Sequence, residues 1–282
     1  MDNPEEHSEF FPHAAISRVN RYKALAKNVR VRRGTKSFTN IPVYDDINTA
    51  DPFLTLVKSK ESKEAAKENC IFMDSAIAGM GSTAAFQITQ QASCLDECLK
   101  LYDQLVPLTP IMMAMTASSP AFYGVLADTD NRMPAYNQAL DDRTAAELKI
   151  PNFKPRTGPV NCYLSGANEQ FNDVAFQTNV KLENLMLRQG VPATLAKHLA
   201  FVFNFDPLVL YSGKIFVDDV ADQSLFENIN SSVWQSLRLK PPVESTDCWW
   251  RVEFRTMSVQ PTEFENAAFG IFIVLLSRAI LK

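Results

Sequence analysis

One strand-like segment near the end of the chain carries the residues best suited to chemistry. From Trp250 to Arg255 apolar and charged residues alternate, so Arg251, Glu253 and Arg255 share one face of a strand. Arginines hold carboxylate or phosphate groups through paired hydrogen bonds, and a glutamate can bind a cation. The pattern indicates either an ordinary solvated antiparallel sheet or an anion site that contains one possible metal ligand.

Other charged residues could serve the same chemistry. Arg238 and Lys240 form a cation pair directly before two prolines. Two further charged clusters, at Asp128–Arg132 and Asp141–Thr144, are also compatible with plain turns whose solvated ion pairs are worth about 0–1 kcal/mol. From spacing alone, the sequence suggests an anion site served by arginines, with one carboxylate available for a metal.

Standard catalytic motifs are absent from the sequence. It contains no GxxxxGK[ST] phosphate loop, no GxGxxG, no HExxH, no GxSxG and no paired CxxC motif. The three histidines are His7, His13 and His198, which argues against a histidine metal site or a Ser-His-Asp triad. We interpret His198 as a structural residue near the apolar face of a helix.

The elements that must position these residues are predicted from periodicity. Strands at Cys70–Met73, Phe86–Gln91 and Trp250–Arg255 should lie in one mainly antiparallel sheet, which makes the fold class α+β. Helices that begin near Ser93, Thr109 and Thr262 should pack on one side of this sheet. The helix that begins near Thr262 would cover the apolar face of the last strand, which leaves the charged face free for a ligand. Because it is too apolar to stand alone and continues to Lys282, it suggests a truncation and the need for a partner.

Composition limits the class of protein. Of the 282 residues 46% are hydrophobic and 21% are charged, which excludes a disordered chain. The net charge of −4 gives no general attraction to nucleic acid or membrane. The region 18–36 holds eight basic residues and no acidic one; it predicts an amphipathic helix with a solvated basic face, or otherwise a phosphate or nucleic-acid patch.

Membrane insertion and disulfide formation are not expected. The longest strongly apolar stretch, Ala267–Leu276, is shorter than the roughly 20 residues that a membrane span needs. The five cysteines are odd in number and sparse, which favours a reducing compartment and a cytoplasmic location.

Several motifs together resemble one enzyme family. They are Trp250-Arg251-Val252-Glu253-Phe254-Arg255, Phe264-Glu265-Asn266-Ala267-Ala268, Phe226-Glu227-Asn228-Ile229, Trp234-Gln235, Arg238-Leu239-Lys240-Pro241-Pro242, Asp141-Asp142-Arg143-Thr144, Tyr102-Asp103-Gln104-Leu105, Gly79-Met80-Gly81, Asp206-Pro207-Leu208 and Arg30-Val31-Arg32-Arg33-Gly34. These motifs occur along the chain in the same order as in the catalytic subunit of eukaryotic glutamate–cysteine ligase, which the chain resembles from about Phe10 to Lys282. The resemblance implies one partial catalytic domain over residues 1–282.

The resemblance also implies a fold and a reaction. The family joins the γ-carboxyl of glutamate to the amine of cysteine, with ATP and Mg²⁺, through a γ-glutamyl phosphate, as the first step of glutathione synthesis. Its fold is like that of glutamine synthetase, with a curved antiparallel sheet that forms an active-site cleft and with helices outside. Glutamate and cysteine would be the small-molecule partners, with a modifier subunit as a possible protein partner and no nucleic acid or membrane.

Residue roles follow motif by motif from this resemblance. Glu253 would be a catalytic residue and a magnesium ligand, and Arg255 would be a catalytic residue that contacts glutamate or the transferred phosphate. The glutamate pocket would be lined by Met80, Arg132 and Arg255, with Trp234 beside it. Weaker candidates for binding the nucleotide phosphates are Arg238 and Lys240.

Departures from the family pattern leave two hypotheses open. The family has cysteines soon after the Gly-Met-Gly turn and a tryptophan where Met133 stands, and its glutamate-rich strands for ATP and Mg²⁺ precede the segment that matches Phe10-Phe11-Pro12. The domain would therefore be incomplete at both ends, and we expect this chain alone not to make γ-glutamylcysteine. The alternative is a diverged, non-catalytic relative that acts by binding or regulation.

Overall fold

The computed structural model describes residues 18–35, 39–48, 51, 53, 57, 59–73, 84–215, 218, 222–243 and 247–282. Its helices are α2 Asn20–Arg33, α3 Lys60–Lys67, α5 Leu95–Leu105, α6 Leu108–Met115, α7 Met133–Ala139, α8 Val180–Arg188, α9 Ala193–Val202, α10 Ser224–Ser231 and α11 Glu263–Leu281. Its strands are β1 Thr39–Pro42, β2 Cys70–Met73, β3 Ile88–Gln91, β4 Ala121–Phe122, β5 Val125–Leu126, β6 Thr157–Gly158, β7 Trp234–Gln235, β8 Leu237–Lys240 and β9 Arg251–Phe254.

The central sheet consists of three antiparallel strands in the order β3–β9–β8. Val252 and Phe254 of β9 and Leu237 and Leu239 of β8 are buried in the main hydrophobic core on one face. The charged residues of β8 and β9 alternate with them and lie on the other face, as the period of two requires. The prediction that the segments Phe86–Gln91 and Trp250–Arg255 lie in one sheet is confirmed, and the two strands pair directly.

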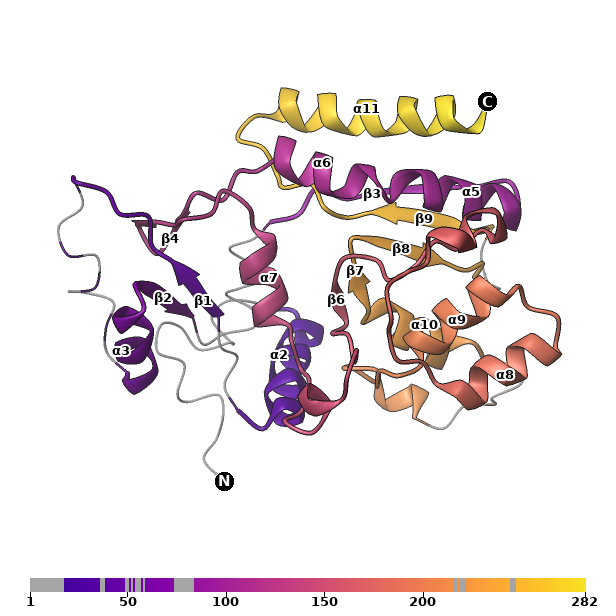
Figure 1. Cartoon of the computed structure of the whole chain (residues 1–282), viewed down its shortest axis with the longest axis horizontal. Helices are drawn as coiled ribbons and strands as arrows, with labels where there is room; N and C mark the ends of the chain where they lie inside the picture. Colours follow the sequence, from indigo (N-terminus) through magenta and orange to yellow (C-terminus); the bar gives the residue numbers. More distant parts are fainter. Residues whose placement is uncertain are drawn as a thin grey trace.

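Helices α5 and α11 cover the apolar face of this sheet (Figure 1). Helix α11 begins where predicted and has a capping box, because the Thr262 side chain accepts from the Glu265 amide while the Glu265 side chain accepts from the Thr262 amide. Helix α5 begins one residue later than predicted, since Cys94 and not Ser93 is its N-cap. Burial of these helices against β3 and β9 removes the apolar face from water and leaves the charged face open to other contacts.

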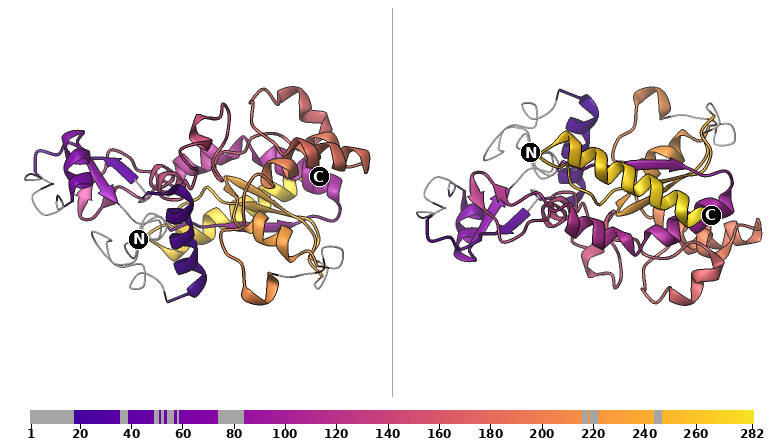
Figure 2. Two further views of the ribbon diagram at one scale, coloured as in Figure 1. Left: turned by 90° about the horizontal axis from the view of Figure 1, so that it is seen from below. Right: turned by 90° about the horizontal axis from the view of Figure 1, so that it is seen from above.

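The prediction that Cys70–Met73 joins the same sheet is wrong. This strand, β2, pairs antiparallel with β1 in a separate two-stranded sheet. Ile41, Ile71 and Met73 form a core of their own with the β4–β5 hairpin and α7. Figure 1 shows this small lobe, with α3, at the opposite end of the molecule from α8 and α9, and Figure 2 shows the same separation from two further sides.

The other sheets of the described residues are short. β4 and β5 form an antiparallel hairpin, while β6 and β7 pair in parallel over two residues each. The class is thus α+β with small, mainly antiparallel sheets. The curved, cleft-forming sheet implied by the resemblance stays a prediction, because the central sheet has three strands in the described residues.

Helix α11 bears on the expectation that no segment is long enough to span a membrane. The helix has 19 residues, and an 18-residue window within it has a mean hydropathy of 1.7, which meets the length and composition of a membrane span. A core helix can have the same length and composition, and Ile273 and Ser277 of α11 are buried against the sheet, where Ser277 accepts from Gln90. Its outer face is apolar and exposed at Phe264, Ile271 and Leu275.

Candidate anion-binding site

Strands β8 and β9 place three charged side chains next to one another on the open face of the central sheet. Arg238 and Glu253 are direct cross-strand neighbours, and Lys240 lies one pleat further along β8 on the same face. Glu253 is only 6% exposed, so its charge requires partners. Both of its oxygens have them: Oε2 lies 2.9 Å from Nε of Arg238, and Oε1 lies 3.1 Å from Nζ of Lys240.

Arg255 completes the shell around Glu253. Its NH1 group lies 3.1 Å from Oε2 of Glu253 and donates to Oε1 of Gln87 at 3.0 Å. Its NH2 group donates to the hydroxyl of Tyr136 at 3.4 Å. Arg255 is 9% exposed, which means that its guanidinium is held in a nearly dry setting where hydrogen bonds are stronger than in water.

Arg132 approaches the same group from another element. It is the N-cap residue of α7, and its NH2 group donates to the main-chain carbonyl of Arg255 at 2.6 Å. Its guanidinium carbon lies 5.5 Å from the centre of the Tyr136 ring. The structure therefore places Arg132 against Arg255, which in turn contacts Glu253, although Arg132 lies more than 100 residues before them in the chain. A common cleft for the three charged groups stays a prediction.

The electrostatics of this group, which we call the arginine cluster (Arg132, Arg238, Lys240, Glu253 and Arg255), favour an anionic ligand. Burial raises the pKa of Glu253, but the nearby charges of Arg238, Arg255 and Lys240 outweigh burial and hold that pKa below its usual value. Burial also lowers the pKa of Arg238 and of Arg132, each to about 10, so both remain cations at neutral pH. Four cations and one carboxylate leave a positive charge that an anion would neutralise.

One other predicted site residue, Trp234, lies outside the arginine cluster. Trp234 is half-buried in β7 and lines a small pocket with Arg21, Tyr211 and Asn228. This pocket adjoins the arginine cluster through Ser231, whose hydroxyl accepts from Arg21 and whose carbonyl lies 3.5 Å from NH1 of Arg238. Met80 lies outside the described residues.

The described residues do not fit a magnesium site at Glu253. Both oxygens of this carboxylate already contact cations, and a divalent ion would add charge to a group that is positive overall. Mg²⁺ prefers about six oxygen ligands, yet no group of three or more His, Cys, Asp or Glu residues in the described part of the chain could hold a metal. The role of Glu253 as a metal ligand stays a prediction that would need further carboxylates.

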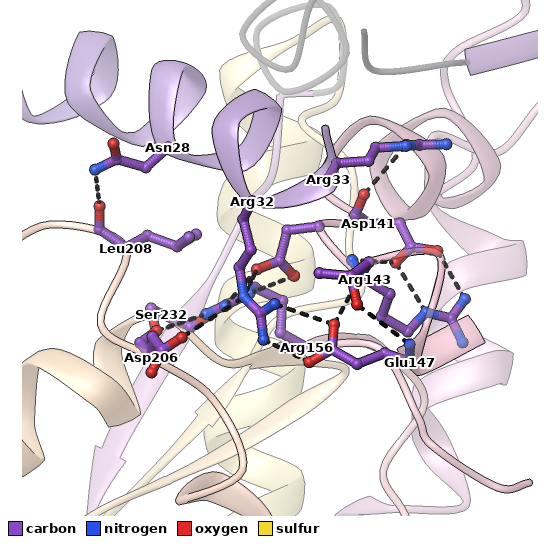
Figure 3. Close-up of polar contacts among 12 residues, drawn as sticks. Asn28, Arg32, Arg33, Asp141, Arg143, Glu147, Arg156, Asp206, Leu208 and Ser232 are labelled. Atoms are coloured by element: carbon purple, nitrogen blue, oxygen red, sulfur yellow. Dashed lines mark hydrogen bonds and ion pairs between the residues drawn. The ribbon is translucent and has the colours of Figure 1, made fainter. Parts of the chain in front are cut away.

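A second charged group, shown in Figure 3, holds parts of the fold together. Asp142 forms two hydrogen bonds to the guanidinium of Arg156, which is completely buried and also donates to Ser232. Arg32 of α2 contacts Asp142 at 3.2 Å and Glu147 at 2.7 Å. This group joins α2 to two loops, and the cluster Asp141–Thr144 is therefore more than a turn with a solvated ion pair.

Sequence reasoning missed Tyr136 and Gln87, which contact the arginines. A signal for Tyr136 exists, because residues four apart share one face of a helix and Tyr136 follows Arg132 at this spacing. No comparable signal exists for Gln87, which precedes β3 and meets Arg255 only because β3 pairs with β9.

Comparisons with known proteins agree with the motifs. The family model described as glutamate–cysteine ligase matches residues 1–282. The chain is 41% identical to the glutamate–cysteine ligase catalytic subunit of Rattus norvegicus over 99% of this chain and 46% of that protein, and 41% identical to that of Homo sapiens over 98% and 44%. It is 43% identical to glutamate–cysteine ligase of Schizosaccharomyces pombe over 98% of this chain and 43% of that protein. The chain thus spans about half the length of these relatives.

Proposed function

The chain belongs to the glutamate–cysteine ligase family, and we propose that its arginine cluster binds the anionic groups of glutamate and phosphate in the ATP-dependent formation of γ-glutamylcysteine. The observation that carries this proposal is the gathering of Arg238, Lys240 and Arg255 around a single carboxylate, with Arg132 against the main chain of Arg255. The proposed place of the reaction is the first step of glutathione synthesis, in the cytoplasm.

The chemistry needs such a group. In the proposed reaction the γ-carboxylate of glutamate attacks the terminal phosphorus of ATP, which releases ADP and forms γ-glutamyl phosphate. The amine of cysteine then attacks the acyl carbon, phosphate leaves with the bonding electrons, and the amine loses a proton to give the amide. Negative charge is concentrated on the phosphoryl oxygens throughout, and fixed guanidinium groups in a dry setting stabilise it without reorganising.

The contacts leave donors for a ligand on Arg255 and Lys240. Arg255 uses three of its five N–H donors, on Glu253, Gln87 and the Tyr136 hydroxyl, and the Lys240 ammonium has three N–H donors of which one contacts Glu253. We propose that Arg132 and Arg255 take the glutamate or the transferred phosphate and that Arg238 and Lys240 take the nucleotide phosphates. ATP and Mg²⁺ are the proposed cofactors, and ATP supplies the phosphoryl group.

A chimera tests the proposal. The segment of the Rattus norvegicus catalytic subunit that matches this chain would be replaced by the chain, and release of phosphate and dipeptide from ATP, glutamate and cysteine would be measured. We expect activity in the chimera and a loss of more than about a hundredfold with Arg255→Met, because one buried guanidinium that stabilises developing charge contributes about 10²–10³ in rate. The control is Arg251→Met, on the same strand but hydrogen-bonded to the Pro241 and Trp249 carbonyls outside the cluster.

The chimera, and not the isolated 282-residue chain, separates this proposal from the alternative of a non-catalytic relative. The described part of the cluster holds one carboxylate, so we expect the chain alone to bind glutamate without making dipeptide. An inactive chimera with normal glutamate binding would favour a binding or regulatory role, in which the partner would be a modifier or catalytic subunit of such a ligase. Turnover by the chain alone would contradict the expectation from its carboxylates.

A further inference from the structure

Tyr136 lies between the two arginines that we assign to the ligand. Its ring packs under the guanidinium of Arg132, 5.5 Å from ring centre to guanidinium carbon, and its hydroxyl accepts from NH2 of Arg255 at 3.4 Å. The side chain is 8% exposed, so both contacts are largely shielded from water. Helix α7 fixes the arrangement, because the main-chain amide of Tyr136 donates to the carbonyl of Arg132 in the first turn.

We propose that Tyr136 is a positioning residue, which holds Arg132 and Arg255 side by side so that both can take one anionic ligand; this inference rests on the proposed function of the arginine cluster. Tyr136 does not need to touch the ligand for this role. It acts through the two guanidinium groups, one through its ring and the other through its hydroxyl.

The physical reason is charge. Two guanidinium groups in a poorly hydrated site repel one another, and each makes the charged form of the other less favourable. A second carboxylate between them would hold them in place but would cancel the charge that the ligand needs. A tyrosine attracts Arg132 through the negative face of its ring and Arg255 through an oxygen lone pair, and it carries no net charge. The neighbouring Glu253 already serves Arg255, Arg238 and Lys240.

The pKa shifts show the repulsion among the buried cations. Burial is the main cause that lowers the pKa of Arg132, and the charge of Arg255 lowers it further. Burial is also the main cause that lowers the pKa of Arg238, and the charge of Arg255 again acts in the same direction.

The test uses the 282-residue chain and orthophosphate as the probe. Dissociation constants for orthophosphate would be measured at constant ionic strength for the wild type, Tyr136→Phe and Tyr136→Leu. Constant ionic strength is needed because added salt alone screens the cluster. Unfolding temperatures without phosphate, together with circular dichroism, would show that each variant is folded. The control is Tyr102→Phe, which removes a hydroxyl that has no hydrogen-bond partner among the described residues from a fully buried tyrosine in the main core.

The expected results differ between the variants. Tyr136→Phe keeps the ring and loses a long hydrogen bond, so phosphate binding should weaken about threefold to tenfold. Tyr136→Leu loses both contacts, so binding should weaken about tenfold to a hundredfold, with partial recovery in the Phe variant. Tyr102→Phe should bind as the wild type does. A purely structural role would lower the unfolding temperature without this graded loss of affinity.

Two results would overturn the inference: wild-type affinity for phosphate in folded Tyr136→Leu, or no phosphate binding by the wild type. A separate titration of the wild type with glutamate tests the proposed function. If glutamate does not bind while phosphate binding keeps its dependence on Tyr136, the proposed function fails and the positioning role stands. If glutamate binds equally well to the wild type and to Tyr136→Leu, the proposed function stands and the positioning role fails.

Discussion

Replacing Glu253 by glutamine should destabilise the chain and strengthen its binding of anions at the same time. The carboxylate lies within 3.1 Å of Arg238, Lys240 and Arg255, and glutamine preserves its size while removing its charge. Removal of one partner from a buried ion pair costs about 3–5 kcal/mol of unfolding free energy. Because the side chains of Arg238 and Lys240 remain 14% and 22% exposed, water screens part of this loss, and we expect a value of about 3 kcal/mol.

The assay combines urea unfolding at pH 7 with an orthophosphate titration. Loss of one negative charge beside a bound anion should lower its dissociation constant at least tenfold, because two unit charges about 4 Å apart repel by about 4 kcal/mol at an effective dielectric constant of about 20. The control is Glu64→Gln, which removes an exposed partner of Lys67 on α3 and should leave both quantities unchanged. Unchanged stability, or weaker phosphate binding, in Glu253→Gln would refute the description of Glu253 as the internal counter-ion of the cluster.

The pH dependence of wild-type stability provides a second test of the role of Glu253. Since the pKa of Glu253 is lowered in the folded chain, its contribution to stability is complete above the pKa of the unfolded carboxyl group. This contribution is lost as the pH falls through the lowered, folded value. The acid-induced loss of stability should therefore be smaller in Glu253→Gln than in the wild type, when each is measured by urea unfolding from pH 7 downward.

Two further predictions concern stability away from the cluster. His198 is buried, and burial lowers its pKa from 6.5 to about 4. Because the folded chain resists protonation of this side chain, stability should fall by about 3 kcal/mol as the pH drops from 6.5 towards 4. Urea unfolding of His198→Leu should lack this decrease, and an identical decrease would contradict the role of His198 in it. Asp142→Asn removes the charge from the buried partner of Arg156 and should cost about 3–5 kcal/mol in urea unfolding. Asp141→Asn affects a more exposed pair with Arg143 and should cost about 1 kcal/mol or less; equal losses in the two variants would show that burial does not set the difference.

The parts of the fold that follow from local periodicity were predictable. Alternation from Trp250 to Arg255 correctly separates the apolar face of β9 from its charged face, and the cap at Thr262 correctly starts α11. The pairing of β2 was not predictable in this way. Alternation identifies a strand without naming its partner, and the partner here is β1, whose four residues carry no strong strand pattern.

The candidate site divides in the same manner. Arg132, Glu253 and Arg255 were found from motifs, but their mutual contacts depend on how α7 packs against β9, a contact between distant parts of the chain. Tyr136 carries a helical spacing signal, yet only the packed structure shows that its hydroxyl reaches Arg255. The sequence around Asp142 is compatible with a solvated turn. The burial of its partner Arg156 could not be predicted, because it depends on loops that are distant in the chain.

The central claim is that the arginine cluster is the anion site of this chain, and glutamate binding to two matched variants tests it most directly. Isothermal titration calorimetry of glutamate would be performed on the folded wild type, Arg255→Met and Arg251→Met. Both arginines belong to the same strand segment, but only Arg255 contacts Glu253 and Tyr136. We expect binding to the wild type and to Arg251→Met, with at least a tenfold loss, about 1.4 kcal/mol, in Arg255→Met. Equal affinity in the two variants, or a loss confined to Arg251→Met, would contradict this claim.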